Sequence, residues 1–213
     1  MKVALIGASG KIGSHILKEL INRKHQVTAI ARNIERIDVK DSKVTPVSVD
    51  VNNTDELTNV LKDNKIVICA FNAGWDNPNL YDDNMKGYES IQKAVRAANI
   101  RRFFMVGNAG SLYVGAKQQV DSDNFPKEML QGAKAVRDYA ERLRRETYLD
   151  WVYLAPQIEI NTTLGRTGKV RLAGEEPIVK NDVASISIED LAMTVVDEVE
   201  DKKYSGKRFT VGY

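Results

Sequence analysis

The chain has 213 residues, of which 43% are hydrophobic, enough for one sizeable core and too few for two ordinary domains. Its 31 Lys and Arg residues nearly balance its 29 Asp and Glu residues, and no long run of like charge is present, so a nucleic-acid-binding protein is not expected. Cys69 is the only cysteine, which excludes an internal disulfide and a cysteine metal cluster. His15 and His25 have no accompanying cluster of ligands, and we expect no metal site.

The N-terminal stretch is apolar only over residues 3–7 and then becomes polar. Such a stretch is too short for a signal peptide or a membrane-spanning helix. We therefore expect a cytoplasmic protein without a membrane or nucleic-acid partner, which acts as a monomer or a homodimer.

Short β-branched runs alternate with longer amphipathic runs, whose apolar residues recur at spacings of three and four. The strand-like runs are nearly continuous in apolar residues, as in a parallel sheet covered on both faces. Strand–helix alternation of this kind predicts a doubly wound, Rossmann-like α/β fold of three layers in one domain, residues 1–213. The predicted strands cover residues 3–6, 26–31, 44–49, 65–70, 102–107, 151–155 and 208–213, and the predicted helices cover residues 11–23, 54–64, 84–99, 127–146 and 185–200.

Two stretches, residues 108–125 and 157–184, lack this regularity. Both follow the carboxyl ends of predicted strands, where α/β proteins build their sites. Beyond the second stretch, Ser187 and Asp190 have the spacing of a capping box that opens the last helix.

Gly7, Gly10 and Gly13 stand where the first strand ends and the first helix begins. Glycine permits a tight turn and a close backbone approach there, and the free amides of the helix N-terminus attract an anion. The pattern predicts that this loop, with Ser9, Lys11 and Ile12, binds the pyrophosphate of a dinucleotide. The alternative is a glycine-rich turn without a ligand.

The second strand ends in Ala31-Arg32-Asn33, and Arg36 follows one turn later. Many NAD-binding folds carry an acidic residue at this position to hold the ribose 2′-hydroxyl. A guanidinium suits the 2′-phosphate of NADP instead, so Arg32 and Arg36 predict a preference for NADP(H) over NAD(H), and Asn33 is expected to bind the cofactor beside them. The alternative is a solvated arginine at a helix start.

Two further segments follow the third and fourth predicted strands. Asp50 and Val51 are expected to bracket an adenine ring. The backbone of Phe71, Asn72, Ala73 and Gly74 is expected to pass the ribose of the cofactor.

Several segments together resemble the short-chain dehydrogenase/reductase superfamily in its atypical, NAD(P)H-binding branch: IGASGKIG, IARN, VGNAGSLYV, LDWVYLAP, GRTGKVRLAG, SISIEDLA and RFTVGY. The resemblance covers nearly the whole chain. It is greatest to the proteins described as NADH-flavin reductases, and more distant to biliverdin reductase B and the NmrA-like proteins. It implies an NAD(P)-bound Rossmann fold with the substrate over the nicotinamide, in a cleft formed by the loops after strands four, five and six.

Typical members of that superfamily use a serine after strand five and a tyrosine–lysine pair spaced Y-x-x-x-K on the next helix. Ser111 fits the first position, but no tyrosine stands near residues 124–125, where it is expected. Tyr139 lies on the predicted helix with Leu143 in place of the lysine. Tyr113 and Lys117 have the right spacing, but the glycine between them argues against a helix, and we expect Tyr113 to contact substrate or nicotinamide rather than to relay a proton.

Hydride transfer to a flavin can dispense with such a donor, because the ring delocalises the charge and the enzyme mainly holds two planar rings together. We therefore expect an NADPH-dependent reductase of a flavin (FMN or FAD) or another planar electron acceptor, with Ser111 and Tyr113 at the reacting groups. Two alternatives are a non-catalytic NADP(H)-binding regulator of the NmrA-like kind and, disfavoured by the missing pair, a sugar-nucleotide epimerase or dehydratase. The residues expected to flank the acceptor are Trp75, Phe125, Tyr153 and Pro156.

Overall fold

Eight strands form the central sheet of the computed structural model, which describes residues 1–213. Their order is β10-β12-β8-β5-β4-β1-β2-β3, so the chain starts near the middle and winds outward in both directions. Every neighbouring pair is parallel except β10 and β12. The strands are β1 (Lys2–Ile6), β2 (Gln26–Ala31), β3 (Val44–Ser48), β4 (Ile66–Cys69), β5 (Arg102–Val106), β8 (Asp150–Pro156), β10 (Arg171–Ala173) and β12 (Lys207–Gly212).

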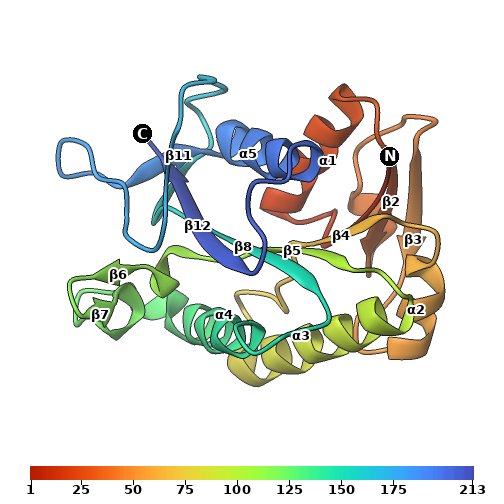
Figure 1. Ribbon diagram of the computed structural model, residues 1–213, viewed down its shortest axis with the longest axis horizontal. Helices are drawn as coiled ribbons and strands as arrows, with labels where there is room; N and C mark the ends of the chain where they lie inside the picture. The colour runs from red at the N-terminus through yellow and green to blue at the C-terminus, as the bar shows by residue number, and fades with distance from the viewer.

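Helices cover both faces of the sheet (Figure 1). One face carries α1 (Lys11–Asn22) and α5 (Ile188–Glu200), and the other carries α2 (Thr54–Leu61), α3 (Leu80–Ala97) and α4 (Leu130–Leu143). Each interface has its own apolar core, because the strands present buried side chains to both sides. The predicted three-layer, doubly wound fold is confirmed.

Cys69 lies inside this core at the end of β4. Its side chain is buried, and burial raises the pKa of the thiol to about 12. The thiol is therefore protonated and unreactive near neutral pH. None of the helices combines the length and the apolar character needed to span a bilayer.

The two irregular stretches contain short elements that the sequence did not predict. In the first, β6 (Tyr113–Val114) and β7 (Lys117–Gln118) form a small hairpin between the turns η2 (Ala109–Ser111) and η3 (Gln119–Asp121). In the second, β9 (Glu159–Asn161) pairs in parallel with β11 (Ser185–Ser187), whose three residues were predicted as the start of the last helix. β10 is added to the edge of the main sheet. Strands of two or three residues are too short to show a periodic pattern, so the sequence does not predict them.

The N-terminus of α5 holds one of these stretches in place. The Ser187 hydroxyl accepts from the Asp190 amide at 3.1 Å, as the predicted cap requires. The Asp190 side chain does not complete the box, however; it accepts instead from the amides of Thr167 (3.0 Å) and Gly168 (2.9 Å) and from the Tyr213 hydroxyl (2.7 Å). Asp190 thus fixes a distant loop rather than its own helix end.

Candidate functional site

The glycine loop joins the ends of three strands. Gly7 follows β1 with φ +84°, and a Cβ atom on it would lie 2.5 Å from the carbonyl oxygen of Ala70, just beyond β4. Its amide donates to the Ile30 carbonyl of β2 at 2.9 Å. A side chain is therefore impossible at Gly7 because the loop is pressed between its neighbours.

Gly13 and Gly10 differ in what surrounds them. A Cβ on Gly13 would lie 2.0 Å from the Gly7 carbonyl oxygen, so this glycine lets α1 pack against the loop. A Cβ on Gly10 would meet only that same oxygen, at 3.2 Å. The chain's own packing therefore gives a weak reason for glycine at position 10, whereas the close approach of a ligand gives a strong one.

The N-terminus of α1 has free hydrogen-bond donors. No side chain caps this helix, and the first intrahelical bond runs from Ser14 to Gly10 at 2.9 Å. The amides of Lys11, Ile12 and Gly13 have no partner in the protein. Such unpaired amides, together with the positive end of the helix dipole and the lack of a side chain at Gly10, fit a pyrophosphate.

Two arginines stand beside this anion site. Arg32 precedes the short turn η1 (Ile34–Arg36) and Arg36 is its last residue; both are exposed and form no ion pair. Asn33 caps η1, because its side-chain oxygen accepts from the Glu35 amide at 2.9 Å. Both guanidinium groups are therefore free to bind a phosphate, whereas the oxygen of Asn33 is not.

The segments after β3 and β4 present backbone more than side chains. Asp50 is exposed and its carboxylate accepts from the Asn52 amide at 2.9 Å, whereas Val51 is buried. Only Asp50 therefore offers surface to an adenine ring, and the expected bracket of two side chains is not formed.

Beyond β4, the Phe71 ring packs toward α3, where a Cβ on Gly87 would lie 2.3 Å from it. The following turn is rigid: the Asn72 side chain accepts from the Gly74 amide at 2.8 Å, and the Ala73 amide donates to Asn84 at 2.8 Å. Gly74 has φ +114° and faces open space. This turn therefore presents a fixed backbone surface.

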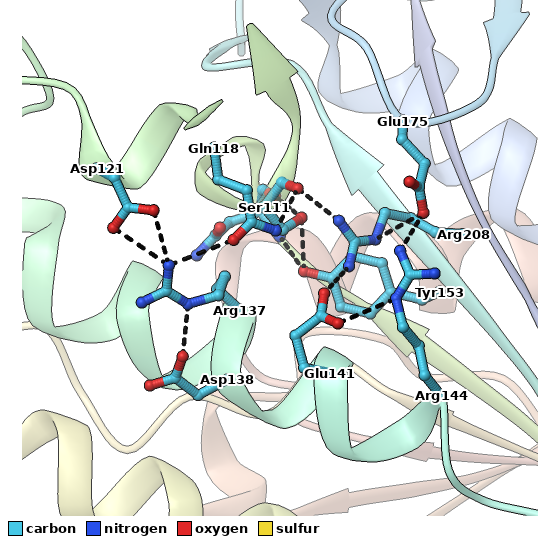
Figure 2. Close-up of polar contacts among 11 residues, drawn as sticks. Ser111, Gln118, Asp121, Arg137, Asp138, Glu141, Arg144, Tyr153, Glu175 and Arg208 are labelled. Carbon is cyan, nitrogen blue, oxygen red and sulfur yellow. Dashed lines mark hydrogen bonds and ion pairs between the residues drawn. The ribbon is translucent and has the colours of Figure 1, made fainter. Parts of the chain in front are cut away.

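Ser111 and Tyr153 form a buried pair at the carboxyl end of β5 (Figure 2). The Ser111 hydroxyl donates to the Asn108 carbonyl at 2.9 Å and accepts from the Tyr153 hydroxyl at 3.1 Å. Tyr153 packs across Gly107, where a Cβ would lie 2.0 Å from its ring. Burial raises the pKa of Tyr153, although its bond to Ser111 opposes this. Tyr153 therefore belongs to the core and does not flank a bound ring, and the Ser111 hydroxyl is turned inward.

Arg208 completes this network and was not recognised from the sequence (Figure 2). It lies on β12 with 2% of its side chain exposed and pairs with Glu141 of α4 at 2.8 Å. Its guanidinium also donates to the Ser111 carbonyl, which accepts from Gln118 at 3.1 Å as well, and lies 5.4 Å from the centre of the Tyr153 ring. The sequence contained a signal for it, an arginine inside an otherwise buried strand. A buried cation must be paired, so this arginine predicts a buried polar network around it.

Tyr113 and Lys117 do not form a proton relay. The hairpin pairs Tyr113 with Gln118 and Val114 with Lys117, and side chains alternate between faces along a strand. Tyr113 and Lys117 therefore point to opposite faces, and the predicted absence of a helix here is confirmed. The Tyr113 amide donates to the Glu175 carbonyl at 2.7 Å, which joins the hairpin to the second irregular stretch.

Tyr139 is no substitute for the missing tyrosine. It is fully buried, its hydroxyl donates to Gln92 at 3.0 Å, and burial raises its pKa well above the ordinary value. The cleft loops therefore contain no tyrosine–lysine pair on one helical face. No cluster of His, Cys, Asp and Glu is arranged to hold a metal ion.

A hollow of about 520 Å³, here named the Phe125 hollow, lies between the two irregular stretches, with walls that include Val114, Lys117, Phe125, Ile158, Pro177 and Val179. Of the residues expected beside an acceptor, only Phe125 lines it. Trp75 is 54% exposed and lies against Gly132 of α4. Pro156 is buried at the end of β8, opposite Val211 of β12.

A second hollow of about 910 Å³, the Lys180 hollow, adjoins the first, with walls that include Leu164, Lys169, Arg171, Val179, Lys180 and Tyr213. Val179 belongs to both. Both volumes fall in the range of about 300–1,000 Å³ that is usual for small-molecule sites.

Comparison with known proteins agrees with this architecture. The chain matches the NAD(P)H-binding family over residues 7–202. It is 34% identical over 217 residues to the uncharacterized protein YwnB of Bacillus subtilis (strain 168), covering 99% of this chain and 98% of that one.

Two solved structures extend the comparison. A provisionally named epimerase from Bacteroides thetaiotaomicron superposes with a TM-score of 0.92 at 38% identity, covering 100% of this chain and 96% of that one. A provisionally named NADH-flavin reductase from Streptococcus pneumoniae TIGR4 gives 0.86 at 29% identity, covering 100% and 99%. With its Rossmann-like sheet and its glycine loop, this chain is a member of the NAD(P)H-binding family, with the fold of the atypical short-chain dehydrogenases/reductases.

Proposed function

We propose that this protein is a reductase that uses NADPH to reduce a flavin or a similar planar acceptor. The observation that carries the proposal is the combination of free amides at the α1 N-terminus with a hollow in the loops after β5 and β8 that contain no tyrosine–lysine pair on one helical face. The similarity to a protein provisionally named an NADH-flavin reductase supports it.

The cofactor fits the residues present. The free amides of Lys11, Ile12 and Gly13 would hold the pyrophosphate, and Arg32 and Arg36 would hold the 2′-phosphate. When bound, NADPH would supply a hydride to the acceptor ring, and the single proton needed to complete the two-electron reduction would come from water.

The remaining residues position the rings. Ser111 acts through its buried hydroxyl, which fixes the turn η2 at the carboxyl end of β5, and is therefore a positioning residue. Tyr113 fixes the hairpin through its amide. Neither residue has to release a proton, because reduction of a flavin ring does not require an acid at a developing alkoxide.

A sugar-nucleotide epimerase is less well supported, although a structure 38% identical to this chain carries the name of an epimerase. Oxidation of a sugar hydroxyl needs a base to take the hydroxyl proton. Tyr113 and Lys117 face apart, and Tyr139 and Tyr153 are buried, so no tyrosine of the cleft is placed for that task.

The test is NADPH oxidation, followed at 340 nm with FMN, FAD or riboflavin as the acceptor. We expect oxidation that depends on both the flavin and the protein. Tight binding of NADPH without oxidation by any flavin would contradict the proposal and favour a non-catalytic NADP(H)-binding regulator.

A further inference from the structure

The Lys180 hollow is positively charged in a chain that is nearly neutral as a whole. Its walls contain Lys169, Arg171 and Lys180 and no Asp or Glu, whereas the chain has 31 basic and 29 acidic residues. Arg171 is already paired within the protein, because it donates to the Val179 carbonyl and to a carboxylate oxygen of Tyr213, the last residue of the chain. Lys169 and Lys180 are exposed and form no ion pair, so their charges are free for an anionic ligand.

A tight turn on the wall of the Lys180 hollow lies between Val179 and Ala184, which line the Phe125 hollow. Lys180 and Val183 exchange both backbone hydrogen bonds at 3.0 Å, and the two residues between them have positive φ, 51° at Asn181 and 63° at Asp182. Asp182 is exposed at the tip of the turn and lines neither hollow. Ala184 lines the Phe125 hollow and the next residue, Ser185, lines the Lys180 hollow. The linings of the two hollows therefore meet at Val179 and at the neighbouring pair Ala184 and Ser185, so that one elongated ligand could contact both.

We propose that the electron acceptor carries a phosphate on a flexible side chain, as FMN does, and that Lys169 and Lys180 bind this phosphate while the ring occupies the Phe125 hollow. This inference rests on the proposed reductase function. The exposed apolar side chains of Leu164, Val179 and Val183 would contact the aliphatic part of the side chain. The two ammonium groups would bind the phosphate by charge-assisted hydrogen bonds.

FMN and riboflavin test the proposal because they share the ring and differ in the phosphate. We would titrate each into the protein without NADPH and follow the fluorescence polarisation of the flavin. We expect the parent to bind FMN at least about ten-fold more tightly than riboflavin, and the double variant Lys169→Met/Lys180→Met to lose this difference. Its affinities for riboflavin and NADPH should not change.

A matched control is Lys86→Met/Lys93→Met, which removes the same charge from exposed positions of α3 on the far side of the sheet. This variant should bind FMN as the parent does. Equal affinity of the parent for FMN and riboflavin, or an equal loss of FMN affinity in both double variants, would overturn the inference.

The failures of the two proposals are distinguishable. Tighter binding of FMN than of riboflavin, lost in the Lys169/Lys180 variant but accompanied by no NADPH oxidation, would support the phosphate site and contradict the reductase. NADPH oxidation with FMN and riboflavin at equal kcat/KM would support the reductase and contradict the phosphate site.

Discussion

Arg208 is a buried cation that holds three parts of the cleft wall together. It contacts Glu141 on α4, the Ser111 carbonyl after β5 and the ring of Tyr153 on β8. Burial of a charge is unfavourable unless it is paired and hydrogen-bonded, so these contacts select one arrangement of the three elements. The turn that carries Ser111 is thereby fixed before any ligand binds.

Arg32 is expected to decide which dinucleotide binds. Its guanidinium is exposed and unpaired beside the glycine loop, and a charge-assisted bond to a phosphate contributes about 1.5–3 kcal/mol. Arg32→Ala should therefore weaken NADPH binding about ten-fold or more and leave NADH binding nearly unchanged. Isothermal titration calorimetry with both cofactors measures this, and equal affinity of the unmutated protein for NADPH and NADH would refute the assignment.

Ser111 and Tyr113 should respond differently to substitution. Tyr113→Phe removes only a hydroxyl and should lower the rate of NADPH oxidation with flavin by less than about ten-fold, whereas loss of a general acid lowers it about 10²–10⁴-fold. Ser111→Ala deprives the buried Tyr153 hydroxyl of its acceptor, and should lower the free energy of unfolding by about 1–3 kcal/mol and reduce the rate more than Tyr113→Phe does.

The measurements are steady-state kinetics at saturating flavin and urea unfolding of both variants and the parent. A loss of a hundred-fold or more in Tyr113→Phe would restore the tyrosine as a proton donor. A Ser111→Ala variant with parental stability would show that the buried bond to Tyr153 contributes nothing.

At the scale of elements, the glycine loop contains two glycines that packing requires and one, Gly10, that packing requires less. Gly7 and Gly13 are required by backbone contacts of 2.5 Å and 2.0 Å to a hypothetical Cβ, and Gly10 is not. Spacing alone identified all of them as one motif. It could not assign the individual roles, because these depend on which strand ends lie beside the loop.

Gly10→Val and Gly13→Val should therefore fail in different ways. Gly10→Val should abolish dinucleotide binding and leave the far-ultraviolet circular dichroism nearly native, because the side chain would fill the space over the free amides. Gly13→Val should reduce stability itself, because its Cβ would overlap the Gly7 carbonyl. Calorimetric titration and thermal unfolding of the two variants check this, and retained cofactor binding by Gly10→Val would mean that the loop is only a turn.

At the scale of the whole molecule, the regular elements were predictable and the cleft side chains were not. Apolar runs and helical periodicity predicted the parallel strands and the helices of the three layers, because each buries a long, continuous pattern. The same reasoning could have excluded Tyr153 from the cleft, since it stands within the buried run WVYLAP of β8. The small strands around the hollows have no such pattern, and their positions depend on tertiary contacts such as the bond from Tyr113 to Glu175.

Asp190 makes one such contact, and its contribution to the free energy of unfolding should depend on pH. Burial raises the pKa of this carboxyl, but hydrogen bonds from Thr167, Tyr213 and Gly168 outweigh burial and hold the pKa below its ordinary value. Because the folded pKa is the lower one, the stabilisation is fully present above the unfolded pKa of about 4 and is lost as the pH falls through the folded pKa. Asp190→Asn should therefore be less stable than the parent by about 1.5–3 kcal/mol at pH 7, and this difference should shrink below about pH 4. Urea unfolding across that range measures it, and a difference that stays constant with pH would show that the loop is not held by the ionised carboxylate.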